Sequence, residues 1–362
     1  MTRRTGAGHV CEYEESEDVR MKVKWGVLGT AAIASYATIP GMQQAENCEL
    51  YAIAGRSEEK VAKFKEKFGF EVGYVGYEKL LSDPNVEAVY IPLPNDIHKE
   101  WVIRALEAGK HVLCEKPLAL NAQEAQEMFD AARRNNVTLV EAYAYLHGQY
   151  IESLCKDVRE GVIGDILYID TAFLTQGYKE DFRLHKEQGG GMIYDLGCYC
   201  TTMTLSLLRA RASRYVDDAS SAAMDEALTP EYIRAVGELT DEGVDAFVGA
   251  IMKFPGGVRV SFDVGMVLGV NGFGRYDRLY IHGTRGAIRS EVEYNQEGSL
   301  SYRIFREGEV IERSVKVDQN YKLEVEQLGR CIRNGETPHI TPEFSIRNAK
   351  ILDALLHEVG YN

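Results

Sequence analysis

The stretch that decides the fold is KWGVLGTAAIA, residues 24–34, an apolar run followed by a turn of small residues. It aligns with the dinucleotide fingerprint G-x-G-x-x-G as Gly29-x-Ala31-x-x-Ala34, with alanine at two of the three glycine positions. The tight turn needs glycine most at the first position. Small residues at the other two still let the backbone approach a pyrophosphate at a helix N-terminus. Taken alone, the match indicates nucleotide binding no more strongly than it indicates ordinary packing of a strand against a turn.

Five further apolar runs follow, and their Val, Ile and Tyr content is typical of buried parallel strands. The six runs are residues 23–28, 50–54, 72–75, 88–93, 111–114 and 138–143. Every gap except the third is long enough for a full helix, and the clearest helix is predicted over 96–108, with Asp96 as its N-cap. Because parallel neighbours need crossover connections, this order predicts a doubly wound α/β sheet with a ligand crevice at the carboxyl ends of its strands.

After Tyr145 the pattern changes and strands come to dominate. The expected elements are a helix at 149–160, a strand at 165–173, a helix after the glycine loop 189–191, hairpins at 244–267 and 279–292, and helices at 321–334 and 342–358. The hairpins suggest an antiparallel sheet. We therefore predict a mobile acidic tail at 1–20, a nucleotide-binding domain at 21–145 and a substrate-binding α/β domain at 146–362.

Composition excludes several classes of function. The chain has 362 residues with 55 acidic and 41 basic side chains, a formal charge of −14 that disfavours nucleic acid as a partner. Its seven cysteines are scattered without a CxxC pair, and its eight histidines form no HExxH motif, so we predict reduced thiols and no metal site. No run approaches the ~18 to 20 apolar residues of a membrane span, so we expect a cytoplasmic protein without a membrane partner.

The end of the second predicted strand bears on the choice of cofactor. It reads Ala54-Gly55-Arg56-Ser57, where NAD-preferring sites often carry an acidic residue for the ribose hydroxyls. Arg56 could stack on adenine or pair with a 2′-phosphate, which tilts the expectation towards NADP without excluding NAD. The alternative is an arginine that is simply solvated.

Polar residues also follow the fourth and fifth strands. The segment that ends the fourth strand contains Leu93, Pro94, Asn95 and His98, and Glu115-Lys116-Pro117 closes the fifth. Both segments belong to the edge where a ligand would lie, and Lys116 is predicted to point towards the crevice. The alternatives are a structural histidine and a Glu-Lys surface ion pair.

A last candidate cluster follows the glycine loop at 189–191. Asp195 and Tyr199 are four residues apart at the start of a predicted helix. On a helix this spacing places a carboxylate and a phenol on one face, where they could address one substrate together. The alternative is an aspartate of the first helical turn and a half-buried tyrosine.

Taken in order, these motifs resemble the Gfo/Idh/MocA oxidoreductases over about residues 21–358, most specifically in the run Leu113-Cys114-Glu115-Lys116-Pro117. The resemblance implies a Rossmann domain followed by an α/β domain whose open, mainly antiparallel sheet often serves in forming dimers or tetramers. It also implies that Lys116 lies beside nicotinamide and the substrate hydroxyl, with Asp195 and Tyr199 completing the catalytic site.

Together these arguments give the candidate residues for an NAD(P) cofactor. The set is Gly29, Thr30, Ala31, Ala32, Ile33, Arg56, Leu93, Pro94, Asn95, His98, Glu115 and Lys116. Tyrosine at position 199 resembles the dihydrodiol-dehydrogenase and glucose-fructose-oxidoreductase branches. Residues 141–149 read EAYAYLHGQ where relatives often read closer to EAFMYRFHPQ, which leaves the substrate open.

The expected reaction is reversible oxidation of a secondary alcohol on a sugar, glycoside or cyclitol, with hydride passing to or from nicotinamide. Tyr199 is expected to act as general base, Lys116 to stabilise its phenolate and the substrate oxygen, and Asp195 to orient ring hydroxyls. Two alternatives stay open: a nicotinamide-dependent glycosidase or lyase acting through transient oxidation, and a sugar or redox sensor without turnover.

Overall fold

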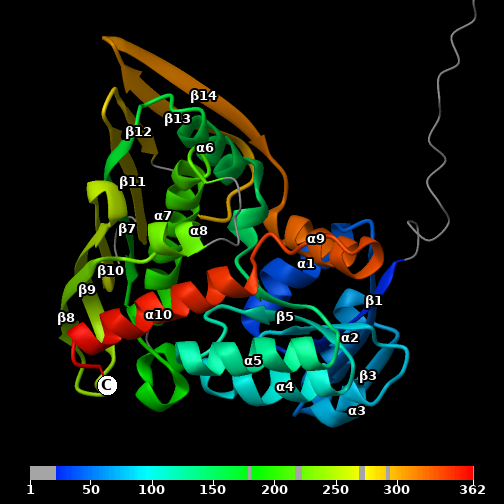
Figure 1. Cartoon of the computed structure of the whole chain (residues 1–362). Coiled ribbons are helices and arrows are strands. Elements are labelled where there is room, and N and C mark those ends of the chain that lie inside the picture. The colour runs from blue at the N-terminus through cyan, green and yellow to red at the C-terminus, as the bar shows by residue number, and fades with distance from the viewer. Residues whose placement is uncertain (1–21, 178–180, 217–221, 269–273, 291–293, 362) are drawn as a thin grey trace, which may run out of the picture.

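The computed structural model of the chain describes residues 22–177, 181–216, 222–268, 274–290 and 294–361. The acidic tail predicted at 1–20 lies outside these described residues. The described chain builds two separate sheets with helices packed between and around them (Figure 1).

Six parallel strands form the first sheet, in the order β3-β2-β1-β4-β5-β6, which confirms the doubly wound prediction. The strands are β1 (Val23–Leu28), β2 (Cys48–Gly55), β3 (Val72–Val75), β4 (Ala88–Ile91), β5 (His111–Glu115) and β6 (Leu139–Ala142). Strand β4 ends two residues earlier than predicted because Pro92 has no N–H to continue the ladder. The strand order reverses between β1 and β4, so a crevice opens at their carboxyl ends.

Helices connect these strands on both faces of the sheet. They are α1 (Ile39–Gln44), α2 (Glu58–Phe68), α3 (Tyr77–Leu81), α4 (His98–Glu107) and α5 (Ala122–Arg134). The prediction that Asp96 is an N-cap is wrong. Residues Asn95–Ile97 form a 3₁₀ turn in which the Ile97 N–H donates to the Pro94 carbonyl at 3.2 Å, so Asp96 lies inside that turn and Ile97 precedes α4.

The second sheet has eight strands in the order β14-β13-β12-β11-β7-β10-β9-β8. They are β7 (Ile166–Gln176), β8 (Tyr232–Leu239), β9 (Asp245–Phe254), β10 (Val258–Leu268), β11 (Arg275–Gly283), β12 (Ala287–Ser290), β13 (Gly298–Arg306) and β14 (Glu309–Val317). All neighbours are antiparallel except β7 with β10, and both predicted hairpins are present. The last residues of the second hairpin prediction, 291–292, lie outside the described residues.

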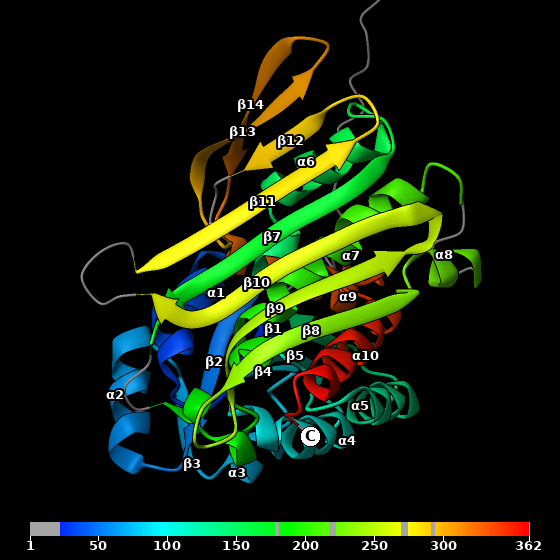
Figure 2. The ribbon, with the colours of Figure 1, turned by 90° about the vertical axis from the view of Figure 1, so that its left-hand side faces the viewer.

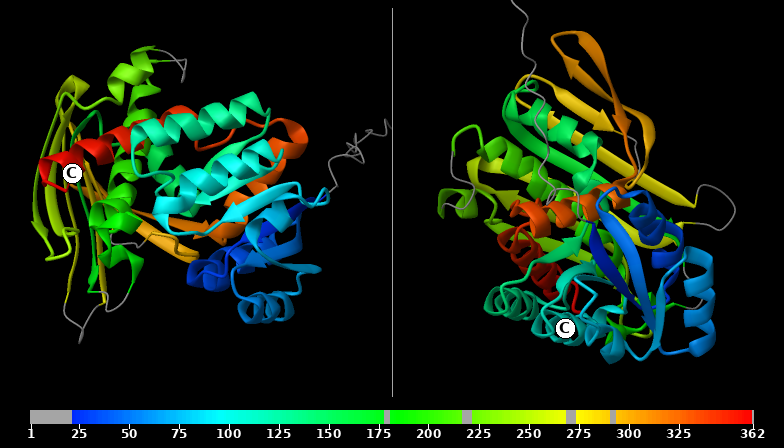
Figure 3. Two further views of the ribbon diagram at one scale, coloured as in Figure 1. Left: turned by 90° about the horizontal axis from the view of Figure 1, so that it is seen from below. Right: turned by 90° about the vertical axis from the view of Figure 1, so that its right-hand side faces the viewer.

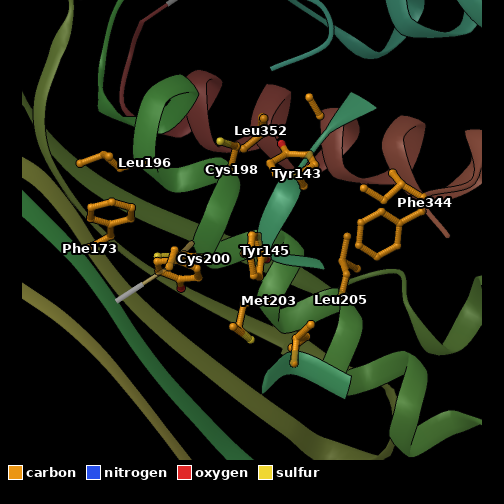
Figure 4. Packing of buried hydrophobic residues seen from close by; sticks show 14 of the residues in the cluster. Tyr143, Tyr145, Phe173, Leu196, Cys198, Cys200, Met203, Leu205, Phe344 and Leu352 are labelled. Atoms are coloured by element: carbon orange, nitrogen blue, oxygen red, sulfur yellow. The ribbon is translucent and has the colours of Figure 1, made fainter. Parts of the chain in front are cut away.

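One face of this sheet carries helices and the other is open (Figure 2). The helices of the second part are α6 (Gln149–Arg159), α7 (Cys198–Ala212), α8 (Ala222–Ala227), α9 (Asn320–Asn334) and α10 (Pro342–Glu358). Helix α7 is buried on nearly every side, between Phe173 of the sheet and Phe344 and Leu352 of α10 (Figure 4). Its position is therefore fixed by the core.

The last two helices return to the first sheet. Helix α9 packs on α1 so closely that a Cβ on Gly41 would lie 2.8 Å from the Tyr321 backbone, and α10 packs along α5 (Figure 3, left). The division of the chain near residue 145 stays a prediction, because helices from both sides of that point share one core. Within the described ranges, no helix is both long and apolar enough to cross a bilayer.

Candidate active site

A cleft of about 990 Å³ lies where the carboxyl ends of β1, β4 and β5 face the second sheet. Its walls come from the turn after β1, the segments after β4 and β5, strand β7 and the first turns of α7 and α9. The crevice predicted from strand order alone is therefore present, and the second sheet closes its far side.

The turn after β1 is shaped for close approach of a ligand. Gly29 has φ of 125° and a Cβ there would lie 3.1 Å from Leu93 Cδ2, so this position favours glycine. Ala31, Ala32 and Ile33 line the cleft, and the small side chains of the two alanines let a ligand approach the first helical N–H groups. Thr30 lies next to the end of β2: a Cβ added to Gly55 would lie 3.4 Å from the Thr30 methyl group. These residues fit the diphosphate of a dinucleotide.

Two of the predicted cofactor residues hold loops together. His98 is fully buried, with Nδ1 2.9 Å from the Pro117 carbonyl oxygen and Nε2 2.8 Å from that of Leu93, and it does not line the cleft. Asn95 lines the cleft and donates from Nδ2 to the Gly189 carbonyl at 2.9 Å. His98 thus connects the segments that follow β4 and β5, and Asn95 connects the segment after β4 to the glycine loop.

Arg56 lies at the outer end of the same turn. It is exposed just beyond β2 and does not line the cleft, while its guanidinium lies close enough to Tyr77 to affect that phenol. The neighbouring backbone joins it to the fingerprint turn, since the Gly29 N–H donates to the Ala54 carbonyl at 2.8 Å. The role of Arg56 in cofactor binding stays a prediction.

Lys116, Asp195 and Tyr199 meet in the cleft although 79 residues separate the first two. Lys116 Nζ donates to the Asp195 carbonyl at 2.7 Å and to its Oδ1 at 3.0 Å. The same ammonium lies 4.9 Å from the centroid of the Tyr199 ring. The i, i+4 spacing thus presents a carboxylate and a phenol to one lysine.

A π-helical turn, Ile193–Gly197, precedes α7 and carries Asp195. Such turns are common at functional sites because they widen the helix and redirect backbone groups. Here the Asp195 carbonyl and carboxylate both face Lys116.

Arg183 is a site residue that the sequence did not reveal. Its Nε lies 2.8 Å from Asp195 Oδ2, and its NH1 lies 2.9 Å from Asp181 Oδ1. It belongs to an irregular segment before the glycine loop, where no periodicity or motif marks it. Asp195 is consequently held between two cations.

These contacts set the charges of the site. Burial alone would lower the pKa of Lys116, but the Asp195 carboxylate outweighs it and the pKa is raised. Burial would raise the pKa of Asp195, but Lys116 and Arg183 hold it well below its usual range. Burial raises the pKa of the Tyr199 phenol well above its ordinary value, and Cys198 and Glu115 act in the same direction. At neutral pH the site therefore holds an ammonium, a carboxylate and a neutral phenol, whereas the sequence led us to expect a phenolate.

Aromatic rings surround the Tyr199 side chain. The centroids of Tyr145, Phe173 and Tyr294 lie 5.6, 5.5 and 5.1 Å from that of Tyr199. Tyr145 and Phe173 reach this cluster from either side of α7 (Figure 4). The Tyr199 hydroxyl accepts from Asn295 Nδ2 at 3.5 Å. This wall combines apolar ring faces with polar groups at its rim, as recognition of a small polyol requires.

Glu115 lines the cleft next to Lys116, and its Oε2 accepts from the Lys116 N–H at 3.3 Å. It accepts from the Tyr90 hydroxyl at 2.5 Å, and that hydroxyl in turn accepts from Thr38 Oγ1 at 2.9 Å. The chain of hydrogen bonds runs from β5 through β4 to the first helix. Glu115 thereby fixes the end of β5, and with it the backbone of Lys116.

A buried carboxyl beside the site gives a prediction for stability. Glu141 is 2% exposed and accepts from the Leu118 N–H at 2.9 Å, and burial raises its pKa from 4.5 to about 7. Between these two values the folded chain binds more protons than the unfolded chain, so the free energy of unfolding falls as pH rises and levels off above about pH 7. We expect Glu141→Gln to remove up to about 3 kcal/mol of this fall. Urea unfolding at several pH values between pH 5 and pH 8 measures this fall. Glu107→Gln, at an exposed position, is the control and should keep the wild-type dependence of the free energy of unfolding on pH. The same wild-type dependence in Glu141→Gln would contradict the assignment.

Comparison with known proteins agrees with this geometry. Residues 23–143 match the model of the oxidoreductase family with an NAD-binding Rossmann fold, and residues 152–289 match the GFO/IDH/MocA C-terminal domain. The chain belongs to the Gfo/Idh/MocA family. It is an NAD(P)-dependent oxidoreductase with the two-sheet architecture of that family.

Named members of the family cover the chain nearly from end to end. It is 31% identical to a D-xylose 1-dehydrogenase (NADP(+)) of Haloferax volcanii, over 91% of this chain and 95% of that one. It is 30% identical to a dTDP-3,4-didehydro-2,6-dideoxy-alpha-D-glucose 3-reductase of Saccharopolyspora spinosa, over 93% and 97%. The crystal structure of KijD10, a 3-ketoreductase from Actinomadura kijaniata in complex with NADP and TDP-benzene, superposes with a TM-score of 0.81 at 27% identity, over 93% and 98%.

Proposed function

We propose that the protein catalyses reversible oxidation of a secondary alcohol on a sugar, glycoside or cyclitol, with NADP as the preferred cofactor. The observation that carries this proposal is the contact of Lys116 with both Asp195 and the Tyr199 ring, inside a cleft that begins at the fingerprint turn. The relatives described above are named as sugar dehydrogenases and reductases, and KijD10 was crystallised with NADP, which supports the class of substrate and cofactor.

The charges of the site define a role for each side chain. A bound nicotinamide supplies the hydride donor or acceptor. The Lys116 ammonium donates a hydrogen bond to the reacting oxygen and stabilises its developing negative charge. The Tyr199 phenol, neutral in the folded protein, gives its proton to that oxygen during reduction and becomes a phenolate; oxidation runs the same step in reverse, with the phenolate form taking the proton of the substrate hydroxyl. Asp195 keeps Lys116 charged and in place, and Phe173 and Tyr294 supply apolar cleft lining beside these groups.

A screen of neutral polyols, sugars and glycosides with NAD⁺ and NADP⁺ tests the proposal through the absorbance of the reduced nicotinamide. Stoichiometric reduction with at least one compound supports a dehydrogenase. Release of free sugar from a glycoside without net reduction would favour the glycosidase or lyase alternative. Saturable binding of both cofactor and sugar without any turnover would favour the sensor.

Replacement of Arg56 should change the choice between the two cofactors. Arg56→Ala removes the cation beside the fingerprint turn and should weaken NADP⁺ binding by about tenfold, because a phosphate contact is lost, while NAD⁺ binding is almost unchanged. Fluorescence titration with each cofactor measures both dissociation constants. Lys63→Ala, an exposed cation on α2, is the matched control. Equal effects on the two cofactors would contradict the NADP preference.

We also propose a homo-oligomer formed through the open face of the second sheet. Val236, Ile251 and Tyr276 are 76%, 49% and 44% exposed on β8, β9 and β11, which is typical of a surface that pairs with a second copy. Light scattering should give a dimer or larger assembly, and Ile251→Arg should shift it to the monomer. A monomeric wild-type protein at micromolar concentration would contradict this proposal.

A reducing, cytoplasmic compartment is the location we propose. The six cysteines within the described part of the chain are free thiols.

A further inference from the structure

The helix that carries Asp195 and Tyr199 begins without a cap of its own. It follows Gly191, which has no side chain, and Met192 at the N-cap position makes no side-chain hydrogen bond. The first N–H groups of a helix need acceptors from elsewhere, and unsatisfied ones let the first turn fray.

A strand of the second sheet supplies the acceptor. Asp245, the first residue of β9 (Figure 2), is fully buried and accepts from the Ile193 N–H at 2.6 Å, across 52 residues of sequence. The Met192 N–H faces the same carboxyl group. A Cβ on Gly191 would lie 2.0 Å from Asp245 Oδ1, so the glycine, which has φ of 105°, is what allows the carboxyl group to reach the helix.

Asp245 is the side chain that accepts from a backbone N–H of this turn, while the Tyr194 hydroxyl of the turn donates to the Leu120 carbonyl at 2.5 Å and further contacts hold the glycine loop. The Tyr361 hydroxyl donates to the Gly190 carbonyl at 2.8 Å, and Asn95 donates to that of Gly189. Only Tyr194 lies between the capped Ile193 and Asp195, whose carbonyl and carboxyl oxygens must both meet Lys116. Fraying of this turn would therefore separate Asp195 from Lys116 directly.

We propose that Asp245 is a positioning residue for catalysis, which caps the π-helical turn from the neighbouring sheet and so holds Asp195 against Lys116. This inference rests on the hydride-transfer function proposed above. Asp245 touches neither substrate nor cofactor, since it does not line the cleft. Because Asp245 acts only on the relative positions of Asp195 and Lys116, its loss should alter kcat and leave ligand binding unchanged.

The test compares two carboxylates that cap helices from a distance. Asp353 accepts from the Ala122 N–H at 2.9 Å at the start of α5, a helix that carries none of the proposed site residues, so Asp353→Ala is the matched control. We expect Asp245→Ala to lower kcat by about tenfold or more, from the loss of a cap, with KM and the dissociation constant of NADP⁺ within about twofold of wild type. Asp245→Asn keeps an acceptor for Ile193 and should restore most of kcat. Asp353→Ala should leave kcat unchanged.

A crystal structure of Asp245→Ala supplies a readout that does not depend on turnover. We expect Lys116 Nζ to lose its contact with the Asp195 carbonyl. The inference is overturned if Asp245→Ala retains wild-type kcat, if its losses match those of Asp353→Ala, or if both Asp245 variants fail to fold, since the role is then purely structural. Absence of turnover in the wild-type protein with the whole substrate panel would instead refute the proposed function.

Discussion

Lys116→Ala is expected to lower kcat by about 10³-fold, because it removes the charged donor that stabilises negative charge on the reacting oxygen. The same change removes a cation from the buried Asp195 carboxylate, which keeps its contact with Arg183, so some activity is lost through poorer orientation as well. The dissociation constant of NADP⁺ should change by less than about threefold, because the fingerprint turn that binds the diphosphate is untouched. Steady-state kinetics and fluorescence titration measure the two quantities separately.

Lys99→Ala is the control for this variant. Lys99 lies on α4, pairs with Glu127 at 2.6 Å on the surface and is remote from the cleft lining, so its loss should leave kcat unchanged. Turnover within tenfold of wild type in folded Lys116→Ala would remove Lys116 from the chemistry.

Tyr199→Phe is expected to lower kcat by about 10²-fold or more and to leave cofactor affinity nearly unchanged, because the ring stays and only the transferable proton is lost. The raised pKa of the phenol makes a further prediction about pH. Reduction needs the protonated phenol, which persists until pH exceeds its pKa. The wild-type rate of reduction should therefore show no loss assignable to Tyr199 below about pH 10.

Tyr150→Phe is the control for this variant, because it removes a tyrosine hydroxyl that lies outside the cleft. The Tyr150 hydroxyl hydrogen-bonds Ser290 Oγ at 2.6 Å, and burial raises its pKa to about 12, which makes it a comparable phenol that does not line the cleft. It should retain wild-type kcat. Equal kcat in Tyr199→Phe and wild type would require a different proton donor.

The fold was largely predictable because many of its helices and strands have a clear periodic pattern of apolar residues. Strands β1 and β3 have the predicted bounds, and α10 begins at Pro342 and ends at Glu358 as expected. Strands β8 and β14, at the two edges of the second sheet, and β13, next to β14, were missed because their sequences contain many polar and charged residues. Edge strands carry a weak apolar pattern, since one side of each meets solvent.

The site was predictable only where motifs mark it. Lys116, Asp195 and Tyr199 follow recognisable signals, but strand order places only Lys116 at the cleft, since Asp195 and Tyr199 come from the start of α7. Arg183 has no such signal, because its role comes from an irregular loop that folds back over the cleft. His98 shows the opposite case: a histidine at the right edge of the sheet whose ring is fully used by backbone carbonyls.

The return of α9 and α10 to the first sheet constrains any attempt to exchange parts between members of this family. A chimaera that replaces only the segment before residue 145 would put a foreign surface beneath Gly41, where α9 leaves no room for a methyl group, and beneath α5, which α10 covers. An exchange of cofactor preference must therefore transfer the segment before residue 145, α9 and α10 together. Otherwise it must be confined to single side chains, such as Arg56, that α9 and α10 do not contact.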